Sequence, residues 1–242
     1  MKRALDFTVA LVGLTVTSPL LLAVMIAIWL QDFRLPFYIA PRAARGGGQF
    51  RMVKFRSMVV NADKLGGSST AATDRRITPL GRLVRAYKID EILQLWNVLK
   101  GDMSLVGPRP QAQTDASLYT DAEKRMLTVR PGITDLASIV FADEGDILRG
   151  SPDPDLLYNQ IIRPWKSRLA LLYIDKRTIW MDLRVIFLTA VAILSRPAAL
   201  RGVRNILARW DADDLLRRMA RRQEPLLAYP PPGASEIVAS CH

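Results

Sequence analysis

The residues best suited to chemistry are two adjacent carboxylates, Asp90 and Glu91, in the segment YKIDEILQLWNVLKGDMSLVGPRP. Arg109 lies between two prolines of this segment, and their rings stiffen the backbone that carries its guanidinium. Carboxylates among cations suit a divalent metal bound with a phosphate ester, because Mg²⁺ takes carboxylates plus phosphate oxygens and arginine grips phosphate in a fork. The pair alone also fits a helix-capping aspartate beside a solvated glutamate. The cations around the pair in the sequence are Arg82, Arg85, Lys88 and Arg109.

Composition narrows the chemistry further. The 242 residues include 34 Lys and Arg against 23 Asp and Glu, a formal net charge of +11, which favours anionic partners such as nucleic acid, phosphate-bearing substrates or acidic lipid. Cys241 is the one cysteine and His242 the one histidine. This excludes a scaffold held by disulfides, and it argues against a zinc site and against catalysis by a histidine base. The common nucleotide-loop, dinucleotide, zinc-protease and serine-hydrolase motifs are absent from the sequence. If the protein is an enzyme, carboxylates and cations must do the work.

Two stripes of apolar residues at helical spacing flank the acidic pair in the sequence. Thr78 and Pro79 form a helix start, with threonine as the cap and proline in the first turn. Apolar residues then repeat at helical spacing to Tyr87 and resume at Ile92, a step of five residues that breaks the stripe. We therefore expect a kink at 88–91. The acidic pair would then open the second helix, where an N-terminus favours anions.

The N-terminal segment is typical of a membrane helix. Phe7 to Leu30 comprises 24 residues without a charge, more than the roughly 20 needed to span a bilayer. Ser18 and Pro19 interrupt its middle, which fits either a kinked spanning helix or a helix that enters and leaves by one face. Each half would reach about 18 Å, only part of the way through the ~30 Å hydrocarbon core. Cations flank both ends, and positive charge marks the cytoplasmic side, which suits the re-entrant alternative.

The rest of the chain predicts a helix-dominated α+β fold with a short sheet and interfacial helices. Residues 49–60 alternate apolar and cationic side chains, as in a strand. A basic amphipathic helix is expected near the C-terminus, suited to a membrane surface or equally to solvent, and the Pro-rich end is expected to be disordered. The expected parts are a membrane-associated re-entrant helix at 1–34, a cytoplasmic catalytic domain at 35–200, the basic helix at 201–224 and the tail at 225–242.

Several motifs together resemble the bacterial sugar transferase family, the monotopic polyprenol-phosphate phosphoglycosyl transferases. KRALDFTVALVGLTVTSPLLL is similar to the family's membrane segment, whose Ser-Pro makes the helix re-entrant. The resemblance covers about residues 2–195, and the sequence departs from the usual family pattern at Asp135–Ile139, which follows RPGIT, and at Pro41–Arg45. These departures bear on sugar specificity. The other matching stretches are PRAARGGGQFRMVKFRSM, RITPLGRLVRAYKIDE, GDMSLVGPRP, RPGIT and YIDKRTIWMDLRVIFLT.

The resemblance implies transfer of a phospho-sugar from a UDP-sugar to polyprenol (undecaprenyl) phosphate, with Mg²⁺ and release of UMP. This is the first membrane step of bacterial exopolysaccharide, O-antigen, capsule or glycoprotein synthesis. Asp90 would be the nucleophile that forms an aspartyl-phosphosugar intermediate. Glu91 would place Mg²⁺ or take a proton, and both carboxylates remain metal candidates. The implied phosphate-binding cations are Arg85, Arg109 and Arg130, with Lys54 and Arg56 as weaker candidates.

The implied partners are the UDP-sugar donor, the polyprenol phosphate acceptor, membrane lipid and downstream glycosyltransferases, without nucleic acid. The implied location is the inner (cytoplasmic) membrane, with the catalytic domain on the cytoplasmic face. Two alternatives stay open. One is a basic, membrane-anchored binding protein, for which an Asp90→Asn change would be harmless. The other is a relative with an unusual donor, or one that serves as a non-catalytic scaffold for glycan assembly.

Overall fold

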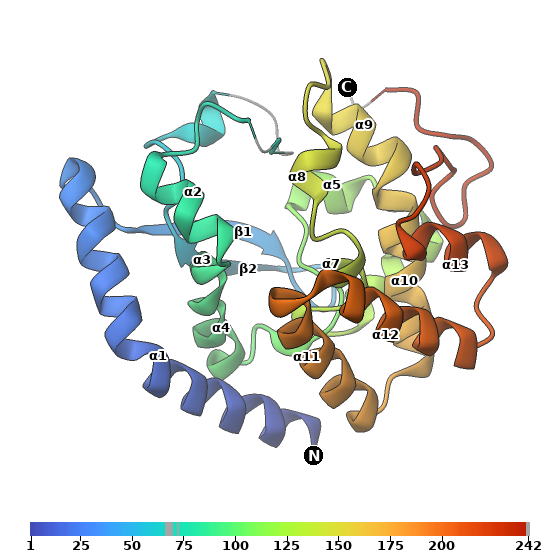
Figure 1. Cartoon of the computed structure of the whole chain (residues 1–242), viewed down its shortest axis with the longest axis horizontal. Helices are drawn as coiled ribbons and strands as arrows, with labels where there is room; N and C mark the ends of the chain where they lie inside the picture. Colours follow the sequence, from blue (N-terminus) through green and yellow to red (C-terminus); the bar gives the residue numbers. More distant parts are fainter. Residues whose placement is uncertain (66–69, 72, 241–242) are drawn as a thin grey trace.

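Helices dominate the fold, which is α+β as predicted. The computed structural model describes residues 1–65, 70–71 and 73–240, so Cys241, His242 and part of the loop at 66–74 lie outside the described residues (Figure 1). The helices are α1 (Lys2–Asp32), α2 (Pro79–Ala86), α3 (Ile89–Ile92), α4 (Gln94–Lys100), α5 (Gln113–Ser117), α6 (Asp121–Lys124), α7 (Leu136–Val140), α8 (Glu144–Ile147), α9 (Pro154–Ile161), α10 (Arg163–Lys176), α11 (Ile179–Leu194), α12 (Arg196–Arg209) and α13 (Asp214–Arg221), with 3₁₀ turns η1 (Ala62–Lys64) and η2 (Arg125–Thr128).

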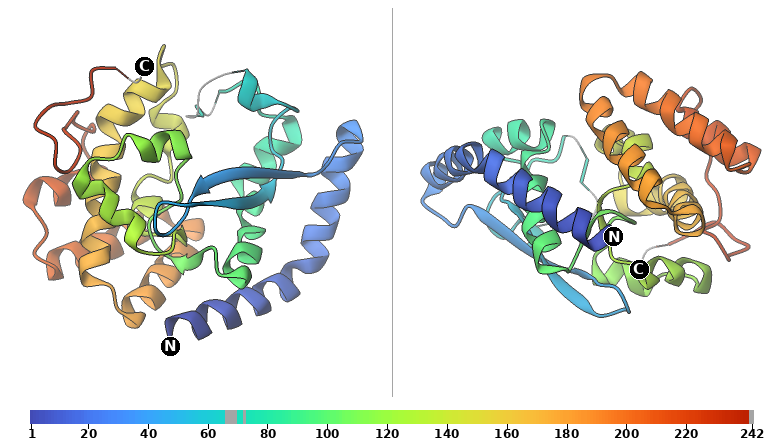
Figure 2. Two further views of the ribbon diagram at one scale, coloured as in Figure 1. Left: turned by 180° about the vertical axis from the view of Figure 1, so that it is seen from behind. Right: turned by 90° about the horizontal axis from the view of Figure 1, so that it is seen from below.

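Helix α1 runs through the predicted break without interruption. Its hydrogen-bonded helix includes Pro19, and Figures 1 and 2 show it changing direction part-way along its length. Proline cannot bond the carbonyl of Thr15 one turn earlier, and the hydroxyl of Ser18 donates to that oxygen instead, at 2.8 Å. The expected break is therefore a bend within one helix. By length and composition alone, α1 is apolar enough to cross a membrane, and most of that surface is exposed.

The N-terminal end of α1 is fixed to the rest of the protein by polar contacts. The buried carboxylate of Asp6 accepts hydrogen bonds from the hydroxyl of Ser104 at 2.8 Å and from the amide of Leu105 at 3.1 Å. Lys2 forms an ion pair with the buried carboxylate of Asp182, with 2.5 Å between Nζ and Oδ2. These contacts place the start of α1 against β3 and α11.

The other end of α1 is fixed to the same body. Arg56, just after β2, donates two hydrogen bonds of 2.6 Å to the carboxylate of Asp32, the last residue of α1. One turn earlier, Ile28 packs in a small buried cluster with Phe55 and Val84. Both ends of the apolar helix therefore contact the folded part of the chain.

A β-hairpin carries one wall of the functional site. β1 (Phe37–Ala43) and β2 (Gln49–Phe55) are antiparallel, and Figure 2 shows them extending across the molecule from the end of α1. The predicted strand over 49–60 thus ends at residue 55. Across the hairpin, Arg42 lies opposite Phe50, and Tyr38 lies opposite Lys54. Side chains alternate along a strand, and Phe50 and Lys54 are four residues apart, so Arg42 and Lys54 lie on the same face.

The second sheet joins two of the sequence motifs. β3 (Ser104–Val106) lies in GDMSLVGPRP and pairs in parallel with β4 (Gly132–Thr134) in RPGIT. The amide of Gly107 donates to the carbonyl of Thr134 at 3.1 Å, and that of Gly132 donates to Pro108 at 2.9 Å. The two backbones approach so closely that a Cβ on Gly132 would lie 2.1 Å from the nitrogen of Gly107. Glycine is required here because no side-chain atom fits.

The C-terminal region differs from the expected single basic helix at 201–224. Two helices, α12 and α13, form there, and the apolar stripe of α12 is buried against the domain, as shown by the fully buried side chains of Val203, Ile206 and Leu207. The stripe faces the core because α12 packs on α11 and α7. It is therefore not presented to a membrane.

The Pro-rich tail also differs from the expected disorder. The tail packs against α10, where the indole of Trp165 donates to the carbonyl of Leu227 at 2.9 Å, and against α9, where the carbonyl of Gln160 accepts from the amide of Tyr229 at 3.1 Å. The ring of Tyr229 packs on Trp165 with centroids 4.9 Å apart, and the guanidinium of Arg168 lies over Tyr229. Aromatic and cation–π contacts hold a segment that composition alone leaves without structure.

Substituting Gly132 tests the close approach of β3 and β4. We expect Gly132→Ala to lower the free energy of unfolding by about 3 kcal/mol, because the new methyl group would overlap backbone atoms of Gly107. Thermal unfolding of the detergent-solubilised protein measures the effect. Gly48→Ala is the matched control, since a Cβ there meets nothing within 4 Å. Equal stability of the two variants would contradict the described backbone contact.

Candidate functional site

The predicted kink at 88–91 is confirmed and positions the acidic pair. α2 begins after Thr78, whose hydroxyl caps it by accepting from the amide of Gly81 at 2.9 Å, and it ends at Ala86. Lys88 then adopts a left-handed conformation with φ 54°, which is uncommon for a residue other than glycine. This turn places Asp90 and Glu91 in the first turn of the short helix α3.

Glu91 is held by Arg109. The two terminal nitrogens of the guanidinium donate to the two carboxylate oxygens, at 2.9 Å from Nη1 to Oε2, and Nη1 also donates to the carbonyl of Ile133 at 2.6 Å. Burial acts to raise the pKa of Glu91, but the adjacent Arg109 outweighs it and holds the pKa below its ordinary value. Glu91 is therefore an ionised, oriented carboxylate whose two oxygens are already engaged.

The carboxylate of Asp90, unlike that of Glu91, is not engaged by a partner in the described part of the chain. Asp90 is 8% exposed, and within residues 1–65, 70–71 and 73–240 its carboxylate has no hydrogen bond or ion pair. Burial raises the pKa of Asp90, and repulsion from Glu91 adds to this, while Lys54, Arg85 and Arg109 oppose the shift. The two neighbouring carboxylates thus differ: one is locked, and the other is free to act on a ligand.

Lys54 faces the acidic pair from β2. Burial lowers the pKa of its ammonium group, and the charge of Asp90 opposes that shift. The ammonium lies 5.6 Å from the ring centroid of Tyr38, its partner across the hairpin. The hairpin therefore brings a half-buried cation to the carboxylates from a distant part of the sequence.

A cleft of about 610 Å³ opens over these side chains. It contains the acidic pair and three of the predicted phosphate-binding cations, Lys54, Arg85 and Arg109. Sequence reasoning did not assign site roles to four other cations of its lining. Arg82 and Lys88 are sequence neighbours of the acidic pair. Strand alternation with Lys54 could have indicated Arg42, whereas no local pattern indicates Lys166. These four are Arg42, Arg82, Lys88 and Lys166.

Two predicted phosphate-binding residues do not line this cleft. Arg56 is engaged by Asp32 at the end of α1, where it anchors the apolar helix. The Nε of Arg130 donates to the carbonyl of Gly101 at 2.9 Å, and its side chain lines a separate cavity. Tertiary contacts with residues far away in sequence thus direct both side chains away from the cleft of Asp90.

Comparison with known proteins gives the family. A family model described as bacterial sugar transferase matches residues 1–196. The chain belongs to the bacterial sugar transferase family. The match ends at the start of α12, so most of α12, α13 and the tail lie beyond it.

Several curated relatives of this sugar transferase carry enzyme names. A UDP-N-acetylgalactosamine-undecaprenyl-phosphate N-acetylgalactosaminephosphotransferase of Aeromonas hydrophila is 32% identical over 204 residues, 81% of this chain and 44% of that protein. An undecaprenyl-phosphate glucose phosphotransferase of Komagataeibacter xylinus is 38% identical over 195 residues, 78% of this chain and 35% of that protein. A UDP-glucose:undecaprenyl-phosphate glucose-1-phosphate transferase of Caulobacter vibrioides is 34% identical over 197 residues, 80% of this chain and 70% of that protein. The chain spans less than half the length of the first two.

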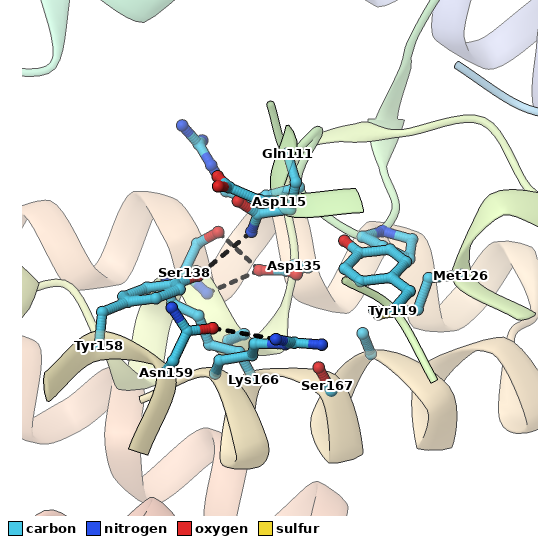
Figure 3. A pocket seen from close by; sticks show the side chains of 15 residues that line it. Gln111, Asp115, Tyr119, Met126, Asp135, Ser138, Tyr158, Asn159, Lys166 and Ser167 are labelled. Carbon is cyan, nitrogen blue, oxygen red and sulfur yellow. Dashed lines mark hydrogen bonds between the residues drawn. The ribbon is translucent and has the colours of Figure 1, made fainter. Parts of the chain in front are cut away.

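A small side cavity of about 50 Å³ adjoins the cleft of this sugar transferase and shares Arg109 and Lys166 with it. Figure 3 shows Ser138 bonded to the buried Asp135, whose carboxylate accepts from both the amide and the hydroxyl of Ser138 at 2.6 Å. Tyr158 lies beside Ser138, and Tyr119 lines the opposite side of the cavity (Figure 3). Asp135 and Ser138 fall in the segment that departs from the usual family pattern, so the departure is located beside the acidic pair.

A double-mutant cycle on Arg109 and Glu91 tests the clamp. We expect Arg109→Gln to lower the free energy of unfolding by about 2 kcal/mol at pH 7, because a partly buried carboxylate loses a charged partner. The folded pKa of Glu91 is lowered, so its stabilisation is complete above the ordinary value of 4.5 and disappears as pH falls through the folded value. The difference from the unmodified protein should therefore shrink on acidification.

The cycle is measured by denaturant unfolding in a chelator-containing, Mg²⁺-free buffer. In a Glu91→Gln background, Arg109→Gln should have a smaller effect with a weaker dependence on pH, which comes from the remaining charge of Asp90. An equal loss of stability with and without Glu91 would show that Arg109 acts through its other contacts alone.

Proposed function

We propose that this bacterial sugar transferase moves a sugar 1-phosphate from a UDP-sugar to undecaprenyl phosphate and releases UMP. The names of the relatives from Aeromonas hydrophila, Komagataeibacter xylinus and Caulobacter vibrioides support this acceptor and this class of reaction. The observation that carries the proposal is the buried carboxylate of Asp90, which no partner engages within the described residues, beside a glutamate that Arg109 holds in place. Seven cations and six carboxylates, Asp90 among them, line the cleft. The reaction would be the first membrane step of a bacterial glycan.

Asp90 acts as the nucleophile in this proposal. A carboxylate oxygen of Asp90 attacks the phosphorus that carries the sugar, and the bond from that phosphorus to the bridging oxygen breaks, so UMP leaves with the electron pair. An oxygen of undecaprenyl phosphate then attacks the same phosphorus, and the bond to Asp90 breaks, which restores the carboxylate and yields the polyprenyl diphosphate sugar. Covalent catalysis of this kind divides one displacement into two easier steps.

The cations of the cleft balance the charge of the diphosphate. Lys54 and Arg85 already act on the charge of Asp90, and Arg42 and Arg82 add positive charge to the same lining. Stabilising charge as it develops on phosphate oxygens is the main task in phosphoryl transfer. Arg109 is committed to Glu91, so its part is to orient the glutamate.

Magnesium belongs to the same proposal, with Asp90 as the protein ligand that fits best. Its carboxylate is unengaged, whereas both oxygens of Glu91 accept from Arg109. Within the described residues there is no group of three or more His, Cys, Asp or Glu arranged for a metal, which fits an ion held largely by substrate phosphates. When bound, Mg²⁺ would neutralise negative charge on the diphosphate.

We further propose that α1 is re-entrant, so that the enzyme is monotopic and lies on the cytoplasmic face of the inner membrane. Both ends of α1 contact one folded body, through Asp6 at one end and Asp32 at the other. A straight helix of 31 residues would be about 46 Å long, so it would carry its second end across the ~30 Å hydrocarbon core and away from the body that holds the first end. The bend at Pro19 and these two anchors support a helix that dips into the bilayer and returns.

UMP release is the direct test of the reaction. Purified protein is incubated with Mg²⁺, undecaprenyl phosphate and one UDP-sugar at a time. We expect UMP with at least one donor, and a loss of at least about 1,000-fold in Asp90→Asn, because the nucleophile is removed. Without acceptor, intact-protein mass spectrometry should detect an adduct with the mass of the sugar phosphate, and this adduct should be absent in Asp90→Asn.

Asp146→Asn is the matched control, since Asp146 lies on the cleft rim and pairs with Arg149 at its outer side. It should keep most of the activity. A folded protein that is silent with every donor, or an Asp90→Asn variant that stays active, would favour a non-catalytic scaffold or a basic binding protein instead.

Cysteine labelling tests the membrane topology. In a Cys241→Ser background, Ala4→Cys and Arg34→Cys place one thiol at each end of α1, at exposed positions. We expect both thiols to be protected from a membrane-impermeant maleimide in intact spheroplasts and labelled after lysis, because both ends lie on the cytoplasmic side. Labelling of exactly one of the two before lysis would show a spanning helix.

A further inference from the structure

A second cavity, of about 180 Å³, lies at the N-terminal end of α1. It shares no lining residue with the cleft that contains Asp90. Its lining combines the start of α1, the loop before β4 and the segment between α10 and α11, which are far apart in sequence. The charged side chains of its lining are Lys2, Arg3, Arg45, Arg130, Arg177 and Asp6.

Within the described residues, carboxylates do not balance the positive charge that lines this cavity. The carboxylate of Asp6 is engaged by Ser104 and Leu105. Of the five cations, Lys2 alone has an ion pair within the described part of the chain, with Asp182. A cavity of this kind favours an anion, and arginine forks fit phosphate oxygens.

The arginines of this cavity differ in how many of their guanidinium nitrogens already donate to other groups. Arg3 donates to the carbonyl of Leu99 at 2.7 Å and Arg130 donates to that of Gly101, both neutral acceptors that leave the positive charge in place. Arg45 and Arg177 are exposed, and no hydrogen bond or ion pair engages either side chain within residues 1–65, 70–71 and 73–240. These two guanidinium groups are wholly available to a ligand, and Arg130 is engaged through its Nε alone within the described residues.

Exposed apolar side chains follow Arg3 along α1 and follow Arg177 into α11, which favours an amphiphilic ligand. Phe7 lies one turn beyond Arg3 on α1 and is 46% exposed. Three residues after Arg177, Trp180 is 78% exposed near the start of α11, followed by the exposed Leu183. A free anion would use the cations alone, whereas a lipid would also cover this apolar surface.

We propose that this cavity binds the phosphate headgroup of an anionic phospholipid, with the acyl chains against the exposed surfaces of α1 and α11. The proposal rests on the membrane placement of α1 proposed above, and it assigns to Arg130 a phosphate that is not the reacting one. The bound lipid would seat the start of the apolar helix at the headgroup level of an anionic membrane. Each cation near such a surface adds to its attraction.

Thermal unfolding of the full chain in a neutral detergent tests the site. The probes are dihexanoyl phosphatidylglycerol, dihexanoyl phosphatidylcholine and inorganic phosphate, each added separately. We expect phosphatidylglycerol to raise the midpoint by about 5 °C at a concentration 100 times its Kd, and the other two to raise it far less. An equal rise with inorganic phosphate would overturn the lipid assignment in favour of a site for free anions.

Variants locate the effect. Arg45→Gln with Arg177→Gln should keep the midpoint of the lipid-free protein, because both side chains are exposed and unengaged, and should lose the rise with phosphatidylglycerol. Arg201→Gln with Arg204→Gln removes the same charge from exposed positions of α12 and should keep the rise. If the first pair kept the rise, the cavity would not be the lipid site.

The same variants separate this proposal from the proposed reaction. Arg45→Gln with Arg177→Gln should still release UMP in detergent, because neither residue lines the cleft of Asp90. If the unmodified protein released no UMP but retained the lipid-dependent rise, the reaction would be contradicted and the lipid site would stand.

Discussion

The bidentate pair between Arg109 and Glu91 is the constraint around which the site is built. Glu91 comes from the helix break at α3, Arg109 follows β3, and the carbonyl of Ile133 in β4 accepts from the same guanidinium. Three segments are thus fixed at one point. The approach of Gly107 to Gly132 sets how near β4 comes to the arginine. With Glu91 engaged in this way, the neighbouring Asp90 remains the carboxylate that is free to meet a ligand.

The same short strand connects the apolar helix to the site. β3 receives Asp6 of α1 through Ser104 and Leu105, and its C-terminal end leads within three residues to Arg109. The position of α1 is therefore coupled to that of the cleft through β3. In the proposed function, whose acceptor is a lipid phosphate, this connection would fix Asp90 relative to the membrane surface. At the other end of α1, Asp32 and Arg56 complete the attachment.

The region beyond the family match also reaches the cleft. Arg222, after α13, forms an ion pair with Asp143 at 3.0 Å and lies over the ring of Phe141, and Arg196, the last residue of the match, pairs with the same carboxylate at 2.7 Å. Asp143 and Phe141 both line the cleft. Arg222 directly follows α13, which packs on α12 and α10. A part of the chain outside the common core of the family therefore supports one wall of its functional site.

Local sequence determined the features that depend on neighbours along the chain. The five-residue step between the apolar stripes placed the kink at 88–91 and brought Asp90 and Glu91 to it, and the uncharged run marked α1. Residue types and motif spacing also identified the family. Only the tertiary structure decided which cations face the pair. Arg56 and Arg130 match the motifs, yet distant partners direct them elsewhere, whereas Arg42 and Lys166 reach the cleft by strand register and helix packing. Long side chains take their direction from contacts between remote segments, and no local pattern records those contacts.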